Sequence, residues 1–290
     1  MATRTWPVPP VDQTLHCIGD FHAEEILARR YDKIIEDLGH RLVPDVLTHL
    51  QVGDQGKARA QDDQVALGFL NRLPGQWYAV CGNHDIQNDS RTPLEWAAAY
   101  GMPAANYSVD LGYAQLIVLA PDSFIHQESL AGALPFLDAE LKRVSPKPAY
   151  IAAHFPLYNT VLGDPTTDWT SLQGRPAAPF FATPDADIRS VIAANSNAKA
   201  WICGHTHSRT QTHGFVKAEL IGNRVIAFIN ASSVFYVGHR HGGQSYADPI
   251  QTLYITYQTN PERIEVRLRD HGAGVWNGFG AQRVATVTFG

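Results

Sequence analysis

Short apolar runs alternate with amphipathic stretches along the first two thirds of the chain. Five runs have the β-branched and apolar character of buried strands, and they cover residues 14–18, 46–52, 77–81, 150–153 and 200–203. Apolar residues at helical spacing predict helices over residues 24–38, 64–73 and 134–144, and a further helix to about residue 194. The last helix should start at Thr183-Pro184-Asp185, with Thr183 as N-cap and Pro184 as the first helical residue. The alternation predicts an α/β fold.

The rest of the chain reads mainly as strands and loops. Further strands are expected at residues 106–109, 114–120, 214–220, 224–229, 253–258 and 263–268. Residues 86–105 carry no clear period and are expected to form a loop. Residues 155–182 are rich in Pro, Gly, Thr and aromatic side chains, and they start directly after His154. A long loop of this kind is often functional, so we expect it to form a lid or rim over a substrate site.

Composition sets limits on the class of protein. The chain has 290 residues with 44% hydrophobic and 18% charged residues, as is usual for a globular protein, and we expect one domain over residues 1–290. The net charge of −5 argues against a nucleic-acid polymer as partner. We expect no membrane partner, because no apolar stretch is long enough to span a bilayer or serve as a signal peptide, and we expect a cytoplasmic location.

Polar motifs follow each of the five buried runs. They are Gly19-Asp20-Phe21-His22, Gly53-Asp54, Gly82-Asn83-His84-Asp85, His154 and Gly204-His205-Thr206-His207. In α/β sheets ligands bind beyond the carboxyl ends of the strands, so these side chains can converge on one crevice. Carboxylates, imidazoles and an amide oxygen suit cations such as Mn, Fe, Zn or Co. The sequence therefore predicts a metal site assembled from the whole chain.

Each motif alone would be weak evidence. Asp and Asn also form turns, and a single His-x-His is more often solvated or packed than metal-bound. The order of the motifs and their placement after strands carry the inference. Three cysteines, Cys17, Cys81 and Cys203, lie inside predicted strands and form no Cys-x-x-Cys pair, so we expect them to be small buried hydrophobic residues.

The ordered set of motifs resembles the calcineurin-like metallophosphoesterase superfamily over roughly residues 14–240. The resemblance implies a four-layer αββα sandwich, in which two mixed β-sheets are flanked by helices. It also implies two divalent or trivalent metal ions, Mn, Fe or Zn, with Co as a further option. The implied ligands are Asp20, His22 and His207 for the first metal, Asn83, His154 and His205 for the second, and Asp54 as a bridge between them. A hydroxide between two metals would be the nucleophile.

Residues beside the ligands have expected roles as well. By the same resemblance, His84 faces the substrate and binds a phosphoryl oxygen or protonates the leaving group, as a general acid. Asp85 would orient His84 or, as is commoner, cap the following turn. Arg91, six residues beyond Asp85, is a candidate for phosphate contact, but we expect it to be exposed and solvated. The remaining histidines are expected at the surface or in hydrogen bonds: His16, His40, His49, His126, His213, His239, His241 and His271.

Departures from the family pattern narrow the function. Gln55-Gly56-Lys57 follows Asp54, and Asp85 stands where the Ser/Thr protein phosphatase branch has Glu. The overall likeness is closest to bacterial cyclic-nucleotide-phosphodiesterase-like members, which implies hydrolysis of a small cyclic-nucleotide, glycerol or nucleotide diester. A phosphomonoesterase or a nucleotide-conjugate pyrophosphatase would use the same residues. A catalytically silent protein-binding scaffold is less favoured because the ligand set is complete. The sequence leaves the oligomeric state open, a homodimer included.

Overall fold

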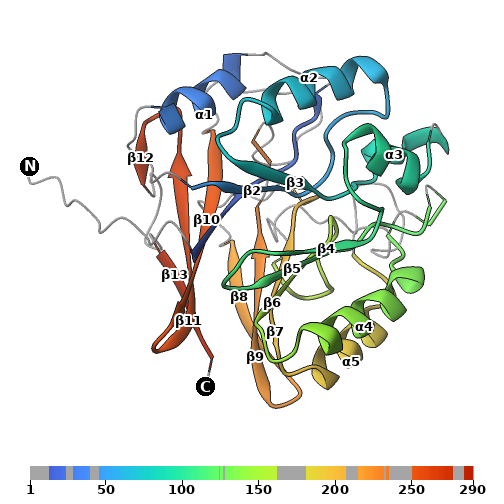
Figure 1. The fold of residues 1–290 in the computed structure, drawn as a ribbon, viewed down its shortest axis with the longest axis vertical. Coiled ribbons are helices and arrows are strands. Elements are labelled where there is room, and N and C mark those ends of the chain that lie inside the picture. The colour runs from blue at the N-terminus through green and yellow to red at the C-terminus, as the bar shows by residue number, and fades with distance from the viewer. Residues whose placement is uncertain are drawn as a thin grey trace, which may run out of the picture.

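Two β-sheets lie face to face in this protein, and helices cover their outer faces (Figure 1). The computed structural model describes residues 13–23, 29–39, 46–89, 91–123, 125–126, 128–161, 181–206, 215–231, 233–234, 250–276 and 284–289. Within these residues, no helix is long and apolar enough to span a membrane.

The first sheet combines N-terminal and C-terminal strands. Its order is β12-β11-β10-β1-β2-β3, and β13 also pairs with β11. The strands are β1 (Thr14–Ile18), β2 (Thr48–Gln51), β3 (Gln76–Ala79), β10 (Gln251–Thr259), β11 (Glu262–Asp270), β12 (Val275–Trp276) and β13 (Val284–Thr288). The strands β1, β2 and β3 run parallel, whereas β10 runs antiparallel to β1. The carboxyl ends of three parallel strands therefore lie at one edge of this sheet.

The second sheet is built from the middle of the chain, in the order β4-β5-β6-β7-β9-β8. Its strands are β4 (Tyr107–Asp110), β5 (Gln115–Val118), β6 (Ala149–Ala152), β7 (Ala198–Cys203), β8 (Val216–Ile221) and β9 (Arg224–Asn230). The four inner strands are parallel, and the two edge strands are antiparallel to their neighbours. Both sheets are thus mixed, as predicted.

Three apolar layers separate the four layers of secondary structure. Side chains of both sheets, such as Leu15 and Ile202, meet in the central layer. One outer layer lies between the first sheet and α1 (Arg29–Gly39), α2 (Ala60–Leu70) and α3 (Pro93–Ala99). The other lies between the second sheet and α4 (Leu134–Val144) and α5 (Asp185–Ala194). The short 3₁₀ helices η3 (His84–Asp89) and η4 (Ala131–Ala133) complete the described elements. The predicted sandwich of two sheets with flanking helices is confirmed.

The start of α5 differs from the prediction. The helix begins at Asp185, and Pro184 is its N-cap in an extended conformation, so the assignment of Thr183 as N-cap and Pro184 as first helical residue was wrong. Thr183 is engaged elsewhere: its N–H donates to the carbonyl of Glu128, and its carbonyl accepts from Leu130. Thr183 therefore forms a β-bridge with Ser129 one residue before the N-cap position.

Residues 86–105 are also more ordered than predicted. They include most of η3 and the whole of α3, which begins with a capping box between Thr92 and Glu95, with Pro93 at the start of the helix. The sequence signal was present in Thr92-Pro93-Leu94-Glu95, which has the spacing of a capping box. Likewise α2 begins at Ala60, four residues before the predicted start at residue 64.

The segment predicted as a lid is described only at its two ends. Residues 162–180 lie outside the described residues. On the described side, Phe155, Leu157 and Val161 are buried in the apolar layer under α4 and α5, as is Ala182 after the gap. These ends of the 155–182 segment therefore belong to the core.

Candidate metal centre

The carboxyl ends of five strands converge at one place between the two sheets. Asp20, Asp54 and Asn83 follow β1, β2 and β3, and His154 and His205 follow β6 and β7. Backbone hydrogen bonds join the turns: the amides of Phe21 and His22 both donate to the carbonyl of Asp54, at 3.0 and 2.9 Å. The two sheets thus contribute side chains to one cluster, as the motif order predicted.

His154 stands at the centre of the first group of side chains. Its Nε2 lies 3.2 Å from Oδ2 of Asp54, 3.0 Å from Oδ1 of Asn83 and 3.2 Å from Nδ1 of His205. The other ring nitrogen, Nδ1, lies 2.9 Å from the carbonyl oxygen of Val52. A proton on Nδ1 for that carbonyl leaves the lone pair of Nε2 facing the cluster, which is the usual arrangement of a metal-binding histidine.

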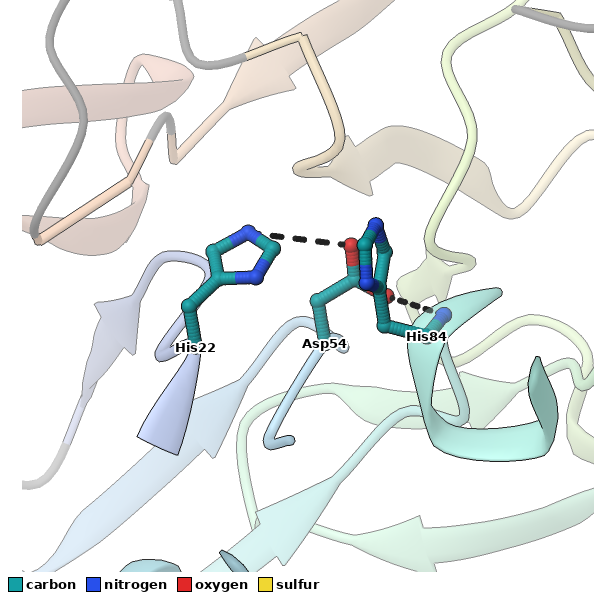
Figure 2. A group of neighbouring side chains, drawn as sticks. All are labelled: His22, Asp54 and His84. Atoms are coloured by element: carbon teal, nitrogen blue, oxygen red, sulfur yellow. Dashed lines mark hydrogen bonds and ion pairs between the residues drawn. The ribbon is translucent and has the colours of Figure 1, made fainter. Parts of the chain in front are cut away.

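Asp54 also belongs to a second group, together with His22 and His84 (Figure 2). Potential ligand atoms of these three residues lie within 4.8 Å of one another, and Nε2 of His22 is 3.9 Å from Oδ2 of Asp54. The backbone N–H of His84 donates to Oδ1 of Asp54 at 2.9 Å. One buried carboxylate is therefore shared by two groups of imidazoles, which is what a bridging ligand requires.

Asp20 lies beside the histidines of the second sheet. Its Oδ2 accepts the backbone N–H of His205 at 2.9 Å, and its Oδ1 is 4.0 Å from Nδ1 of His154. The carbonyl of Asp20 accepts from the hydroxyl of Ser233 at 3.0 Å. His207, the remaining predicted ligand, lies outside the described residues.

Three of the predicted ligands have a strained backbone. His22, Asp54 and His205 have φ angles of 48°, 54° and 66°, and they are three of the five non-glycine residues with positive φ in the described part of the chain. This left-handed conformation costs about 1–3 kcal/mol per residue, and it is retained where the surroundings enforce it. Because this conformation recurs at three predicted ligands, the surrounding structure must hold their backbones in a conformation that the residues themselves disfavour.

The glycines before the ligands leave room for the next ligand. A Cβ on Gly204 would overlap Oδ1 of Asp20, and a Cβ on Gly82 would overlap both the backbone nitrogen and Oδ1 of Asp54. The carboxylate of one motif therefore packs against the glycine of another. This close approach explains why the turns carry Gly directly before the polar residue.

The charges in the cluster are strongly coupled. Burial alone would raise the pKa of Asp54, but His154, His84 and His22 around it hold that pKa well below its ordinary value. Burial would lower the pKa of His154, yet the carboxylates of Asp54 and Asp20 raise it to about 9. Without a cation in the cluster, His154 would therefore carry a proton at neutral pH. A bound cation would have to displace this proton.

The donor set around His154 fits a metal ion. Atoms that share one metal with bonds of about 2.0–2.2 Å lie roughly 2.8–3.6 Å apart in octahedral or tetrahedral geometry. The contacts of His154 Nε2 with Asp54, Asn83 and His205, at 3.0 to 3.2 Å, fall in this range. Carboxylate, amide oxygen and imidazole are the ligands of borderline and hard cations.

Arg91 is not solvated, so that prediction was wrong. Its side chain is 9% exposed and forms a two-pronged ion pair with Asp63, at 2.6 and 3.1 Å. Its Nε donates to the carbonyl oxygen of Asp85 at 2.5 Å, and the hydroxyl of Tyr100 also donates to Asp63. The guanidinium thus ties η3 to α2.

Asp85 bonds back to the turn before it and across to the turn after β2, whereas the prediction placed its bonds in the turn that follows. Its carboxylate accepts the backbone N–H of Gly82 and of Gln55, each at 2.8 Å, and that of Gly56 at 3.2 Å. These bonds join the turn after β3 to the turn after β2. Burial, and then the charge of Asp54, raise the pKa of this carboxyl to about 8.

His16, His49 and His271 are buried in hydrogen bonds, and His126 is exposed. His40, His213, His239 and His241 lie outside the described residues. Cys17, Cys81 and Cys203 are buried free thiols, as predicted.

The sequence interpretation missed two glutamines below the cluster. Gln51 and Gln55 are fully buried and bond to the ligand turns. For Gln51 the sequence carried a signal, because a polar amide stands between the apolar residues Leu50 and Val52 in a predicted buried strand.

Known proteins resemble this chain in sequence profile and in fold. The sequence profile of the calcineurin-like phosphoesterase family matches residues 14–209. A dimetal phosphatase from Danio rerio has a similar fold, with a TM-score of 0.63 at 12% identity over 97% of this chain and 100% of the other. GAP50, the anchor in the inner membrane complex of Plasmodium, gives 0.59 at 11% identity over 96% and 89%. No match was found among curated proteins. At these identities the solved structures show the fold alone, whereas the profile shows that the chain belongs to the calcineurin-like phosphoesterase family.

Proposed function

We propose that this protein is a binuclear metal-dependent phosphodiesterase that hydrolyses small phosphodiesters, such as a cyclic nucleotide or a glycerol or nucleotide diester. Membership of the family supports metal-dependent hydrolysis of a phosphoester. The observation that carries the proposal is the position of Asp54, whose carboxylate belongs to both groups of potential ligands.

The proposed ligands divide between two metals. Asp20, His22 and His207 would hold the first, Asn83, His154 and His205 the second, and Asp54 both. When bound, two ions such as Mn, Fe, Zn or Co supply positive charge to the phosphoryl oxygens and lower the pKa of a water molecule. The short contacts around Nε2 of His154 support the second group. The shared carboxylate and Nε2 of His22 support the first.

His84 is the proposed catalytic histidine. It is only partly buried, whereas Asp54 and His154 beside it are almost fully buried. Its backbone is fixed on Asp54, and its ring stands perpendicular to that of His22, with 5.0 Å between ring centroids (Figure 2). A partly exposed imidazole at the edge of the cluster can bind a phosphoryl oxygen or give a proton to the leaving oxygen.

The ion pair between Arg91 and Asp63 supports a phosphodiester substrate over a phosphomonoester. A monoester carries up to two negative charges at neutral pH, and a diester carries one. Arg91 follows the Gly82-Asn83-His84-Asp85 motif closely in sequence, but Asp63 already neutralises it. A diester, with its single negative charge, therefore needs fewer positively charged side chains for its binding than a monoester does. We assign the small diester on this basis, together with the likeness to the bacterial cyclic-nucleotide-phosphodiesterase-like branch.

Two chromogenic substrates test the proposal. Metal-stripped protein would be re-supplied with Mn, Fe, Zn, Co or Mg in turn and assayed on bis(p-nitrophenyl) phosphate and on p-nitrophenyl phosphate. Faster hydrolysis of the diester with a restored metal is the expected result. Preference for the monoester would instead indicate a phosphomonoesterase. No hydrolysis with any metal would indicate a catalytically silent scaffold.

A further inference from the structure

Two buried glutamine side chains interlock directly beneath the metal cluster. Gln51 is the last residue of β2, and Gln55 follows Asp54 in the next turn. Both are fully buried, and the amide NH₂ group of Gln55 donates to Oε1 of Gln51. A buried amide has to satisfy two donor hydrogens as well as its oxygen, so the partners of each side chain fix its orientation.

Gln51 bonds to the turns after β1 and β2. Its Oε1 accepts the backbone N–H of Gly53 at 3.0 Å. Its Nε2 donates to the carbonyl of Gly53 at 2.6 Å and to that of Gly19 at 3.2 Å. Gly53 and Gly19 directly precede Asp54 and Asp20, two of the proposed ligands.

Gln55 extends the contact to β3 and α3. Its Nε2 donates to the carbonyl of Val80 at 2.9 Å, at the entry to the turn that carries Asn83. Its Oε1 accepts the indole N–H of Trp96 in α3 at 2.9 Å. The two amides therefore touch the backbone of all three ligand turns of the first sheet and join them to the helical layer above.

We propose that Gln51 and Gln55 are positioning residues of the metal centre, which hold the turns of Asp20, Asp54 and Asn83 at the spacing that two metals require. This inference rests on the proposed function. The partners explain why amides are needed: a carboxylate at Gln51 would face the carbonyl oxygens of Gly53 and Gly19 without a hydrogen, and an apolar side chain would leave them unbonded.

The strain in the turns gives these bonds a function beyond packing. Asp54 has a φ of 54°. The side-chain amide of Gln51 forms hydrogen bonds with both the N–H and the carbonyl of Gly53, the residue directly before Asp54. Without these hydrogen bonds the turn can relax towards an unstrained conformation, and the carboxylate of Asp54 then moves away from the metal positions. Loss of metal affinity should therefore exceed loss of folding stability.

Four variants of the full chain test the proposal. Gln51→Met removes the bonds to Gly53 and Gly19, Gln55→Met removes those to Val80 and Trp96, and Trp96→Phe removes a single donor from outside the cluster. The matched control is Gln115→Met. Gln115 is a buried glutamine at the start of β5, and its amide donates to Ser108 at the strand end opposite to the ligands.

Metal affinity is the decisive readout. Each metal-stripped protein would be titrated with Mn²⁺ and with Zn²⁺ by calorimetry, and its thermal unfolding without metal would be recorded in parallel. Residues that orient metal ligands typically change affinity about 10- to 100-fold when they are replaced. We expect a loss of this size for Gln51→Met, a similar or smaller loss for Gln55→Met, the smallest loss for Trp96→Phe, and wild-type affinity for Gln115→Met.

The outcomes separate the two proposals. Wild-type protein that binds no metal would contradict the proposed function itself. Wild-type protein that binds two metals, with Gln51→Met and Trp96→Phe unchanged in affinity, would overturn the positioning role. Equal loss of affinity in Gln115→Met would also overturn it, because the effect would then follow from removal of any buried amide. If Gln51→Met fails to fold, the result for Trp96→Phe decides.

Discussion

Two clusters of buried histidines in this protein have opposite characters. One is the candidate metal cluster at the strand ends, with His22 and His154. The other, here called the strand-interior cluster, consists of His16, His49 and His271. His16 and His49 are paired across β1 and β2 on the face turned away from the central apolar layer, and His271 directly follows β11.

In the strand-interior cluster the partners of the rings are fixed. The Nδ1 atoms of His16 and His49 lie 2.8 Å apart, and Nε2 of His49 lies 2.6 Å from the carbonyl of Pro74. Thr252 connects His16 to His271 at 2.8 and 2.6 Å. Nδ1 of His271 then meets Asp37 at 2.8 Å. Each ring nitrogen has a partner within the fold, so this cluster has no need of an added ion.

The carboxylates show the same contrast. Asp37 is bound by the guanidinium of Arg269 at 2.7 and 2.5 Å, a permanent cation. Asp54 is bordered by imidazoles, which are neutral or charged according to their protons. A carboxylate paired with Arg is a structural ion pair, whereas a carboxylate among imidazoles can exchange their protons for a metal. Both clusters contain histidine and aspartate, so residue type alone does not distinguish them. They differ in their position on the strands and in whether the carboxylate is paired with an arginine or with imidazoles.

Replacing the shared carboxylate should have the largest effect. Asp54→Asn keeps an oxygen for the N–H of His84 but removes the charge that both metals would share. We expect loss of both metals and a fall in kcat/KM of at least about a thousandfold, since such sites contribute several kcal/mol. Steady-state assays with metal analysis measure both effects, and unfolding without metal should remain cooperative. Full activity with two metals bound would remove Asp54 from the site.

His84→Ala should separate chemistry from metal binding. Both metals should stay bound, while turnover falls about 10²- to 10⁴-fold, with the greatest loss on esters that have poor leaving groups. Rates for a series of aryl and alkyl diesters measure this dependence. An equal loss for activated and unactivated esters would argue against proton donation by His84.

Asp37→Asn should lower the stability of the fold and leave metal binding and turnover unchanged. It leaves the buried charge of Arg269 without its counter-ion, which typically costs about 3–5 kcal/mol of stability. Urea unfolding of the metal-stripped protein at pH 7 measures the loss. Metal content and turnover of the folded fraction should match the wild type. A fall in metal affinity as large as that of Asp54→Asn would erase the distinction between the clusters.

The strand-interior cluster should also make stability depend on pH. Burial lowers the pKa of His49 to about 4 and that of His16 well below its ordinary value. The unfolded chain therefore binds more protons than the folded protein between about pH 6.5 and 4, so stability falls on acidification through that window. At pH 5 the His49 contribution amounts to about 2 kcal/mol.

The pH effect can be assigned by substitution. Urea unfolding at pH 7 and pH 5 should show a smaller difference for His49→Gln than for the wild type. Below about pH 4 a second loss is expected. Burial opposes ionisation of Asp37, but bonds from Arg269 and His271 lower its pKa to about 2. An unchanged pH dependence in His49→Gln would show that His49 is not the titrating group.

The sequence predicted the convergence of the motifs because strand ends are strong local signals. A Gly-Asp or Gly-His after an apolar run indicates a turn at the end of a strand, and the order of several such motifs indicates that the turns share one site. Partners distant in sequence gave no such signal. Arg91 reads as a surface residue until α2 brings Asp63 beside it, and Gln55 gains its role only from Val80 and Trp96. By contrast, the capping box of α3 was readable from the sequence and was overlooked.

The central claim is that one carboxylate at the end of β2 joins two metal ions. Metal content per chain, measured after titration of wild-type and Asp54→Asn protein with Mn²⁺ or Zn²⁺ and removal of the excess, tests it most directly. The account predicts two ions per wild-type chain and loss of both in the variant. One ion or none in the wild type, or two ions retained in Asp54→Asn, would contradict it.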